Sequence, residues 1–112
     1  MLEGLKASRD RFDYELRELY VVLPSMTDKS APVVETVHAA IEQVLGQAPS
    51  YVASPGSYDQ KHIDRIGKLR NCIAYGPGEL ELAHKPDEWI GITDMLDSAK
   101  VMARSLETLL LP

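Results

Sequence analysis

The sequence predicts an α/β fold. Three observations support this prediction: apolar and polar residues alternate over residues 12–22, residues 72–75 form a continuous apolar run, and apolar residues recur with the helical period of 3.6 over residues 94–110. Helices that alternate with strands along a chain favour a layered α/β architecture. At 112 residues, the chain has the length of one small domain.

The N-terminal part predicts a short helix over residues 1–9 and then a strand over residues 12–22. Alternation of apolar and charged residues is the period of a strand with one buried face. The apolar side chains that would share this face are Phe12, Tyr14 and Leu16. Pro24 would end the strand, because proline has no N–H to donate to a neighbouring strand.

A helix is predicted over about residues 31–45. Ser30 is placed to cap its N-terminus, Pro32 suits its first turn, and Gly46 suits the left-handed turn that follows a helix. The residues expected to form its buried stripe are Val34, Val37, Ile41, Val44 and Leu45.

Shorter elements follow in the middle of the chain. Tyr51–Ala53 predicts a brief strand, and residues 58–66 predict a short helix. The run Cys72–Tyr75 is apolar throughout, which is typical of a strand that is buried on both faces.

The last element is a helix over residues 94–110, with Thr93 as its expected N-cap. Its apolar residues recur at helical spacing, so we expect them to form the buried face. They are Met95, Leu96, Ala99, Met102, Ala103, Leu106 and Leu110.

Composition excludes several classes of protein. Lys and Arg total 12 against 17 Asp and Glu, and no long basic run occurs, so the electrostatic footprint of a nucleic-acid-binding protein is missing. The single cysteine, Cys72, cannot form an internal disulfide and suits a reducing cytoplasm. Residues 1–6 lack the features of a signal peptide, and no apolar run approaches the ~20 residues that cross a bilayer. We expect a cytoplasmic protein with neither nucleic acid nor membrane as a partner.

Side chains that could bind a metal ion or take part in catalysis occur in the loop over residues 76–91, where His84 lies close in sequence to Asp87 and Glu88. A neutral imidazole is a common zinc ligand, and a nearby carboxylate often orients such a ring. On composition alone, a surface histidine beside solvated acids is the alternative interpretation.

A second candidate loop covers residues 54–62. Gly56 and Ser57 stand between a predicted strand and a predicted helix, where free N–H groups and a hydroxyl can bind an anion such as a carboxylate. The alternative is structural, with Ser57 or Asp59 serving only as the N-cap of the short helix.

Three motifs in these loops occur in an order that resembles the end of a known enzyme family. They are Ser54–Ile63, Asn71–Gly78 with its Gly-Pro-Gly ending, and Ala83–Ile90 with its Ala-His-Lys-Pro-Asp-Glu core. The chain from about residue 12 onward resembles the C-terminal part of the ArgE/DapE (acetylornithine deacetylase/succinyl-diaminopimelate desuccinylase) enzymes of peptidase family M20. Within that family, it is most similar to the YgeY-like hydrolases associated with selenium metabolism.

The resemblance implies a fold and a domain organisation. It predicts a partial zinc-exopeptidase-like catalytic domain that contributes the C-terminal strands and helices. Residues 1–24 would be the end of the lid or dimerisation domain with its return strand, and residues 25–112 would be the C-terminal part of the catalytic domain. A homodimer is also implied.

The resemblance also implies roles for individual residues. His84 matches a histidine that binds one of two active-site metal ions, for which zinc is expected first, with cobalt or manganese as alternatives. Gly56, Ser57 and Lys61 match the loop that lines the substrate site, and Asp87 and Glu88 match acids that support the metal site without binding the metal. In the whole enzyme, metal-bound hydroxide would attack an amide or N-acyl bond of a small amino-acid derivative or peptide.

The sequence departs from the family pattern in ways that limit this interpretation. Pro55 stands where the family loop has glycine. Lys61 stands where desuccinylases have arginine, whose planar guanidinium can bind a carboxylate with two hydrogen bonds, so a succinylated substrate is in doubt. The other metal-ligand motifs of the family are missing, so we expect the chain alone to be inactive.

Two other interpretations differ in class from a metallohydrolase. The chain could serve as a non-catalytic binding or oligomerisation module retained from such an enzyme. A small cysteine hydrolase built on Cys72 has little support, because no activating partner is near it in the sequence.

Overall fold

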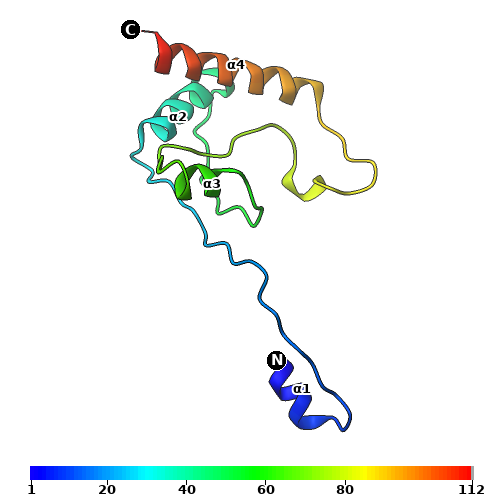
Figure 1. Ribbon diagram of the computed structural model, residues 1–112. Coiled ribbons are helices and arrows are strands. Elements are labelled where there is room, and N and C mark those ends of the chain that lie inside the picture. The colour runs from blue at the N-terminus through cyan, green and yellow to red at the C-terminus, as the bar shows by residue number, and fades with distance from the viewer. Residues whose placement is uncertain (112) are drawn as a thin grey trace.

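The described part of the protein is helical. The computed structural model describes residues 1–111. It contains α1 (Leu2–Ser8), α2 (Pro32–Leu45), α3 (Gln60–Arg65), a 3₁₀ helix η1 (Leu80–Leu82) and α4 (Ile92–Leu110) (Figure 1). The four α-helices agree in place with the helices that the sequence predicts.

The predicted α/β fold is wrong, because no strand occurs within residues 1–111. The segments expected as strands, residues 12–22, 51–53 and 72–75, lie outside regular structure. A strand is stabilised by hydrogen bonds to a neighbouring strand, and in this part of the chain the backbone hydrogen bonds outside the helices close local turns and helix ends. The expected zinc-exopeptidase-like catalytic domain with its C-terminal strands, and the return strand before it, are therefore not found.

The core lies between α2 and α4, which pack against each other (Figure 1). Its buried residues are Val37 and Ala40 from α2 and Val101 from α4, of which Val101 is completely inaccessible to solvent. Ile73 and Tyr75 are partly buried against this cluster, although they form no strand. Such a small core gives limited hydrophobic stabilisation.

The ends of α2 match the prediction in part. Pro32 is the first helical residue, and Gly46 adopts a left-handed backbone with φ 70° at the C-terminal end, both as expected. The predicted cap Ser30 is wrong, because Ala31 occupies the N-cap position. Ser30 instead donates its N–H and its hydroxyl to the carboxylate of Asp28, at 2.9 and 2.7 Å.

The orientation of α4 also differs from the prediction. The helix begins at Ile92 with Gly91 as its N-cap, slightly before the predicted cap Thr93. The residues buried against α2 are Ser98, Val101 and Ser105, whereas the longer apolar side chains expected on the buried face are exposed. Ser105 can lie in the interface because its hydroxyl donates a hydrogen bond to the carbonyl of Val101 at 2.8 Å. Helix α2 covers one face of α4, and the apolar side chains that were expected to be buried remain exposed to solvent.

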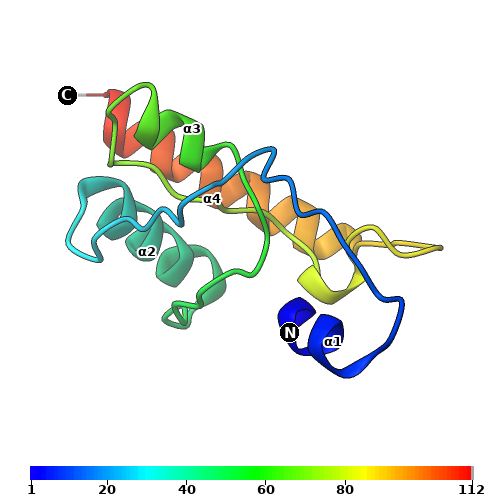
Figure 2. The ribbon, with the colours of Figure 1, turned by 60° about the horizontal axis from the view of Figure 1, so that its bottom comes forward.

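The N-terminal part extends away from this helix pair. α1 has no buried residue and is fixed to the following segment by an ion pair between Lys6 and Asp13 at 2.7 Å and by a hydrogen bond from Tyr14 to Glu3. Figure 1 shows residues 12–24 running as an open tether to the rest. The radius of gyration is 20.0 Å, against about 13 Å for a compact domain of this length. Figure 2 shows the same segment from a direction in which α1 comes toward the viewer.

None of the helices within residues 1–111 has the length and apolar character that crossing a bilayer requires.

Candidate functional site

His84 lies at a sharp turn directly after η1. Its φ is 63°, and Asp87 shares this left-handed backbone with a φ of 58°. The left-handed region costs a residue with a side chain roughly 1–2 kcal/mol, so other contacts must hold the turn. One such contact is visible, because the backbone N–H of His84 donates to the carboxylate of Glu88 at 3.0 Å. Glu88 thus fixes the backbone that carries the imidazole.

The imidazole of His84 is exposed and does not belong to a metal-binding cluster. In the described part of the chain, no group of three or more His, Cys, Asp or Glu side chains gathers where it could hold a metal ion. Zinc usually has three or four protein ligands. The residues present therefore do not fit a complete metal site, and His84 is a single exposed donor.

The other candidate loop brings Ser57 and Lys61 together, since the ammonium group of Lys61 donates a hydrogen bond to the hydroxyl of Ser57. Asp59 occupies the N-cap position of α3 but makes no capping hydrogen bond with its side chain. Asp59 therefore stands at the predicted N-cap position, but its side chain does not cap the helix. The hydroxyl of Ser57 accepts its hydrogen bond from Lys61.

Gly56 lies under the ring of Tyr58. A Cβ atom built at Gly56 would come within 2.9 Å of the Tyr58 hydroxyl oxygen. The Gly56 N–H donates to the Ser54 hydroxyl at 3.1 Å, and that hydroxyl lies 2.8 Å from the hydroxyl of Tyr58. A local network of hydroxyl groups therefore shapes this loop, and Tyr58 would have to move for a ligand to approach the backbone of Gly56.

The structure connects the candidate residues within each loop but not between the loops. Ser57 contacts Lys61, and His84 contacts Glu88. Throughout residues 1–111, no hydrogen bond or ion pair links Gly56, Ser57 or Lys61 with the loop that carries His84.

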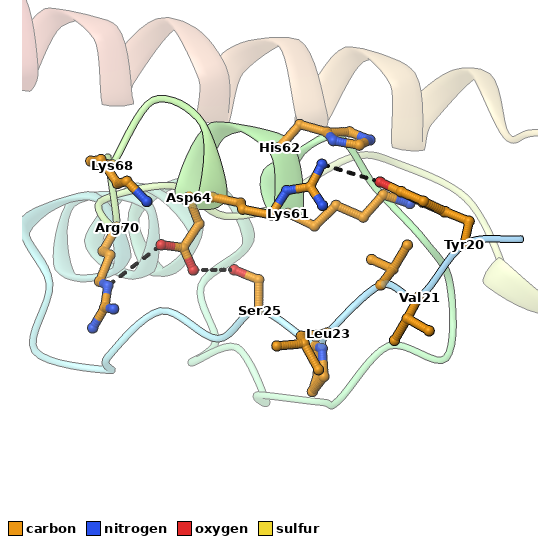
Figure 3. Close-up of a pocket in the computed structure, with 12 residues that line it drawn as sticks. Tyr20, Val21, Leu23, Ser25, Lys61, His62, Asp64, Lys68 and Arg70 are labelled. Atoms are coloured by element: carbon orange, nitrogen blue, oxygen red, sulfur yellow. Dashed lines mark hydrogen bonds and ion pairs between the residues drawn. The ribbon is translucent and has the colours of Figure 1, made fainter. Parts of the chain in front are cut away.

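A groove of about 530 Å³ that the sequence analysis missed lies between residues 20–25 and α3 (Figure 3). Its apolar wall comes from the extended segment, with Val21 and Leu23 among its residues. The opposite wall is rich in basic side chains. These are Lys61, His62, Arg65, Lys68 and Arg70. Lys61 and Arg65 are four positions apart in α3, a helical spacing that could have revealed the start of this basic face in the sequence, whereas Lys68 and Arg70 follow the end of the helix.

Polar contacts hold the two walls of the groove together. Asp64 accepts a hydrogen bond from Ser25 at 3.0 Å and forms an ion pair with Arg70 at 3.4 Å (Figure 3). The guanidinium of Arg65 donates to the Tyr20 hydroxyl at 3.2 Å and lies 5.8 Å from the centre of the Tyr20 ring. Three of the basic side chains thus have partners within the protein, because Lys61 also donates to Ser57. The groove still carries an excess of positive charge, since Asp64 is the one acidic residue of the described chain that lines it.

Gln60 joins three separate segments at the start of α3. Its amide nitrogen donates to the hydroxyl of Thr27 at 2.9 Å and to the carbonyl of Cys72 at 2.6 Å. The Thr27 hydroxyl also donates to the Cys72 carbonyl. These contacts place the predicted loop 54–62 next to residues 25–28 and 72–75, and the thiol of the half-buried Cys72 takes no part in them.

Comparisons with known proteins identify the family. A sequence model described as peptidase family M20/M25/M40 matches residues 3–108. A succinyl-diaminopimelate desuccinylase from Magnetococcus marinus is 31% identical over 102 residues, which cover 89% of this chain and 25% of the relative. The chain therefore spans about a quarter of the length of the curated relative that it matches. No solved structure matches.

The family match extends over nearly the whole chain and includes both candidate loops. The more specific similarity to YgeY-like hydrolases stays a prediction. The ArgE/DapE resemblance carried by the three loop motifs is confirmed, and the chain belongs to peptidase family M20.

Proposed function

We propose that this chain is the C-terminal part of a metal-dependent amidohydrolase that cleaves an amide or N-acyl bond of an amino-acid derivative. The observation that carries the proposal is the family match over residues 3–108, combined with coverage of only 25% of the length of a desuccinylase relative. The chain alone is inactive in this proposal, because within residues 1–111 it offers no cluster of metal-binding side chains.

His84 is the metal ligand that the chain contributes. The proposal is supported by its exposed imidazole and by its left-handed backbone, which the carboxylate of Glu88 holds through the His84 N–H. Glu88 acts as a support for the turn, and Asp87 takes the second left-handed position in it. The remaining ligands come from polypeptide outside this chain. Two divalent ions are expected in the whole enzyme, with zinc first and cobalt or manganese as alternatives.

The loop with Gly56, Ser57 and Lys61 contacts the substrate in this proposal. The Lys61 ammonium and the Ser57 hydroxyl are already adjacent, and together they provide a charged and a neutral donor for a carboxylate. The substrate is a small N-acyl amino acid or a peptide, and the acyl group stays open because Lys61 offers a point charge instead of a planar guanidinium.

The proposal also covers the context of the protein. Residues 1–24 end a lid or dimerisation domain and residues 25–112 belong to the catalytic domain, of which Pro112 lies outside the described residues. The open tether over residues 12–24 supports a boundary in this region. A cytoplasmic location is consistent with the single cysteine.

Zinc titration of the isolated chain tests the claim that its metal site is incomplete. We expect no tight one-to-one binding by isothermal titration calorimetry, and the His84→Ala and His62→Ala variants should give the same weak heats as the parent chain. Tight stoichiometric binding that disappears only in His84→Ala would show that the chain holds a complete site and would contradict the proposal.

A chimera tests the role of His84 in a whole enzyme. The matching quarter of the Magnetococcus marinus desuccinylase would be replaced with this chain, and the bound metal would be measured by elemental analysis. We expect His84→Ala to lose bound metal together with hydrolytic activity, whereas His38→Ala, an α2 histidine that contacts Tyr51, should keep both. Unchanged metal content in His84→Ala would remove His84 from the proposed ligand set.

A further inference from the structure

The groove between residues 20–25 and α3 concentrates positive charge in an acidic protein. The chain has a net charge of -5. The lining of the groove has the opposite sign, since within residues 1–111 four Lys or Arg side chains and one acidic side chain, Asp64, contribute to it. With His62 counted as neutral, four positive charges against one negative charge leave an excess of three. A cleft lined by one sign of charge attracts ligands of the other sign, so the groove favours an anion.

Both walls of the groove come from this chain and are joined by its own contacts. Ser25 donates a hydrogen bond to Asp64 at 3.0 Å, and Arg65 donates to the Tyr20 hydroxyl at 3.2 Å (Figure 3). The extended segment is therefore fixed to α3 at two points. A single copy of the chain forms the groove from its own residues.

Two cations at one end of the groove are available to a ligand. Lys68 and Arg70 lie at the same end, next to Asp64 (Figure 3). Within residues 1–111, Lys68 takes part in no ion pair. Arg70 uses Nε for its ion pair with Asp64 at 3.4 Å, and its side chain is 85% exposed. The two terminal nitrogens of its guanidinium can therefore donate to a bound anion.

A guanidinium beside an ammonium suits a phosphate group. Arginine can donate two parallel hydrogen bonds to phosphate oxygens, and lysine adds a point charge. A phosphate monoester carries a charge of about −1.5 to −2 at pH 7, whereas a single carboxylate carries −1. The excess of three positive charges therefore favours the phosphate over the carboxylate.

The other wall of the groove requires an apolar group on the same ligand. Val21 and Leu23 line this wall and are 53% and 77% exposed. An apolar ligand group that covers these side chains removes them from water, which is favourable. The volume of about 530 Å³ lies within the range of about 300–1,000 Å³ that is typical of small-molecule sites.

We propose that the groove binds a phosphate monoester that carries a small apolar group. The phosphate contacts Lys68 and Arg70, and the apolar group packs against Val21 and Leu23. This site goes beyond the function proposed above, since it uses neither His84 nor a metal ion. Lys61 also lines the groove, but its ammonium group donates to Ser57, and the proposal gives it no role.

Calorimetric titration of the chain at pH 7.5, with a metal chelator present, tests the chemical class of the ligand. Phenyl phosphate should bind with one-to-one stoichiometry. Inorganic phosphate should bind about tenfold more weakly, because it lacks the apolar group, and benzoate should also bind more weakly, because it has one charge. Phenol should give no measurable binding. Absence of phenyl phosphate binding, or equal binding of inorganic phosphate or phenol, would overturn the proposal.

Matched variants test the location of the site. Lys68→Gln should weaken phenyl phosphate binding by roughly fivefold or more. Lys100→Gln removes the same charge from α4, where Lys100 pairs with Asp97, and should leave binding unchanged. Leu23→Ser should weaken the binding of phenyl phosphate but not of inorganic phosphate, because only the apolar contact is lost. Far-UV circular dichroism checks that the variants keep their helices. Equal effects of the two lysine variants would show attraction to overall charge and would overturn the proposed site.

Discussion

The side-chain oxygen of Asn71 accepts a hydrogen bond from the backbone N–H of Val33 at 2.9 Å, across 38 positions of the chain. The first N–H groups of a helix have no partner within the helix, and a side chain at the N-cap usually satisfies one of them. In α2 the N-cap is Ala31, which has no suitable side chain, and a remote residue takes this role.

Replacing Asn71 should therefore destabilise α2 as the loss of a cap does. We expect Asn71→Ala to lower the free energy of unfolding by about 1 kcal/mol, measured by urea denaturation. Asn71→Asp should restore most of the loss, because a carboxylate accepts the same hydrogen bond and its charge is favourable at a helix N-terminus. Ser30→Ala should change the free energy by less than about 0.5 kcal/mol. The reverse ranking of Asn71→Ala and Ser30→Ala would restore Ser30 as the effective cap.

Val101 is the central residue of the small core and is 0% exposed. We expect Val101→Ala to lower the free energy of unfolding by about 2 kcal/mol, because it removes two buried methyl groups and leaves a cavity. The control is Val52→Ala at a position that is 81% exposed, where the same change should have little effect. Equal effects of the two changes on the urea midpoint would mean that the α2–α4 contact is not the stabilising core.

Substitution of Gly46, at the end of α2, can distinguish the cost of backbone strain from the cost of poor packing. Its φ is 70°, and a Cβ atom placed there meets no atom within 4 Å. Gly46→Ala should thus cost about 1 kcal/mol from the left-handed backbone alone, while Gly46→Asn should cost less. Gly4→Ala, in helix α1 with equally open space, should instead increase helicity. Thermal melts followed by circular dichroism distinguish these effects. A Gly46→Ala variant with unchanged thermal stability would argue against the left-handed turn.

Asp28 should show a measurable dependence on pH. The backbone N–H of Ser30 and, to a smaller extent, its hydroxyl donate to the Asp28 carboxylate and hold its pKa below the ordinary value. A lowered pKa in the folded state means that the contribution of Asp28 to stability is complete above about pH 4 and is lost as the pH falls through the folded pKa. The effect is small because the group is fully solvent-exposed.

Carboxyl NMR titration of the folded chain measures this pKa directly. Ser30→Ala removes only the hydroxyl, so the Asp28 midpoint should move part of the way up toward the ordinary value. A parent midpoint at or above the ordinary value would show that Ser30 does not favour the carboxylate in solution.

The helices of this chain could be predicted because their signals are local. Pro32 and Gly46 mark the ends of α2 through their own backbone preferences, and the period of apolar residues marks α4. The role of Asn71 could not be predicted in the same way, because its partner Val33 is far away in the sequence. Ser30 has the correct residue type for a cap, but Asp28 competes for it two residues earlier.

The strand predictions were wrong because the alternation of apolar and polar residues in a segment does not show whether another strand lies beside it to form hydrogen bonds. Residues 12–22 have the alternation of a half-buried strand, yet Leu16 and Leu19 are exposed and no strand lies beside them in residues 1–111. The same limit applies to α4, where periodicity predicted a buried face that includes Met95, Leu96 and Leu106, and these side chains are exposed. Periodicity shows which residues share a face, and tertiary packing decides whether that face is covered.

The candidate site could be predicted only through residues that interact locally. Ser57 with Lys61, and His84 with Glu88, are each four positions apart, and the structure brings both pairs together. The groove between residues 20–25 and α3 depends on long-range contacts such as Asp64 with Ser25 and could not be located from spacing. Gln60 was missed for the same reason, since both of its partners lie far from it along the chain.

The elongated form of the chain, 66 × 36 × 20 Å, affects how it would migrate through a porous gel. A compact protein with the same radius of gyration of 20.0 Å would contain about 330 residues. A single copy held open by the tether over residues 12–24 should therefore elute earlier than a compact protein of its own length. Removal of residues 1–24 should shift its elution toward the position of a compact protein of the same mass.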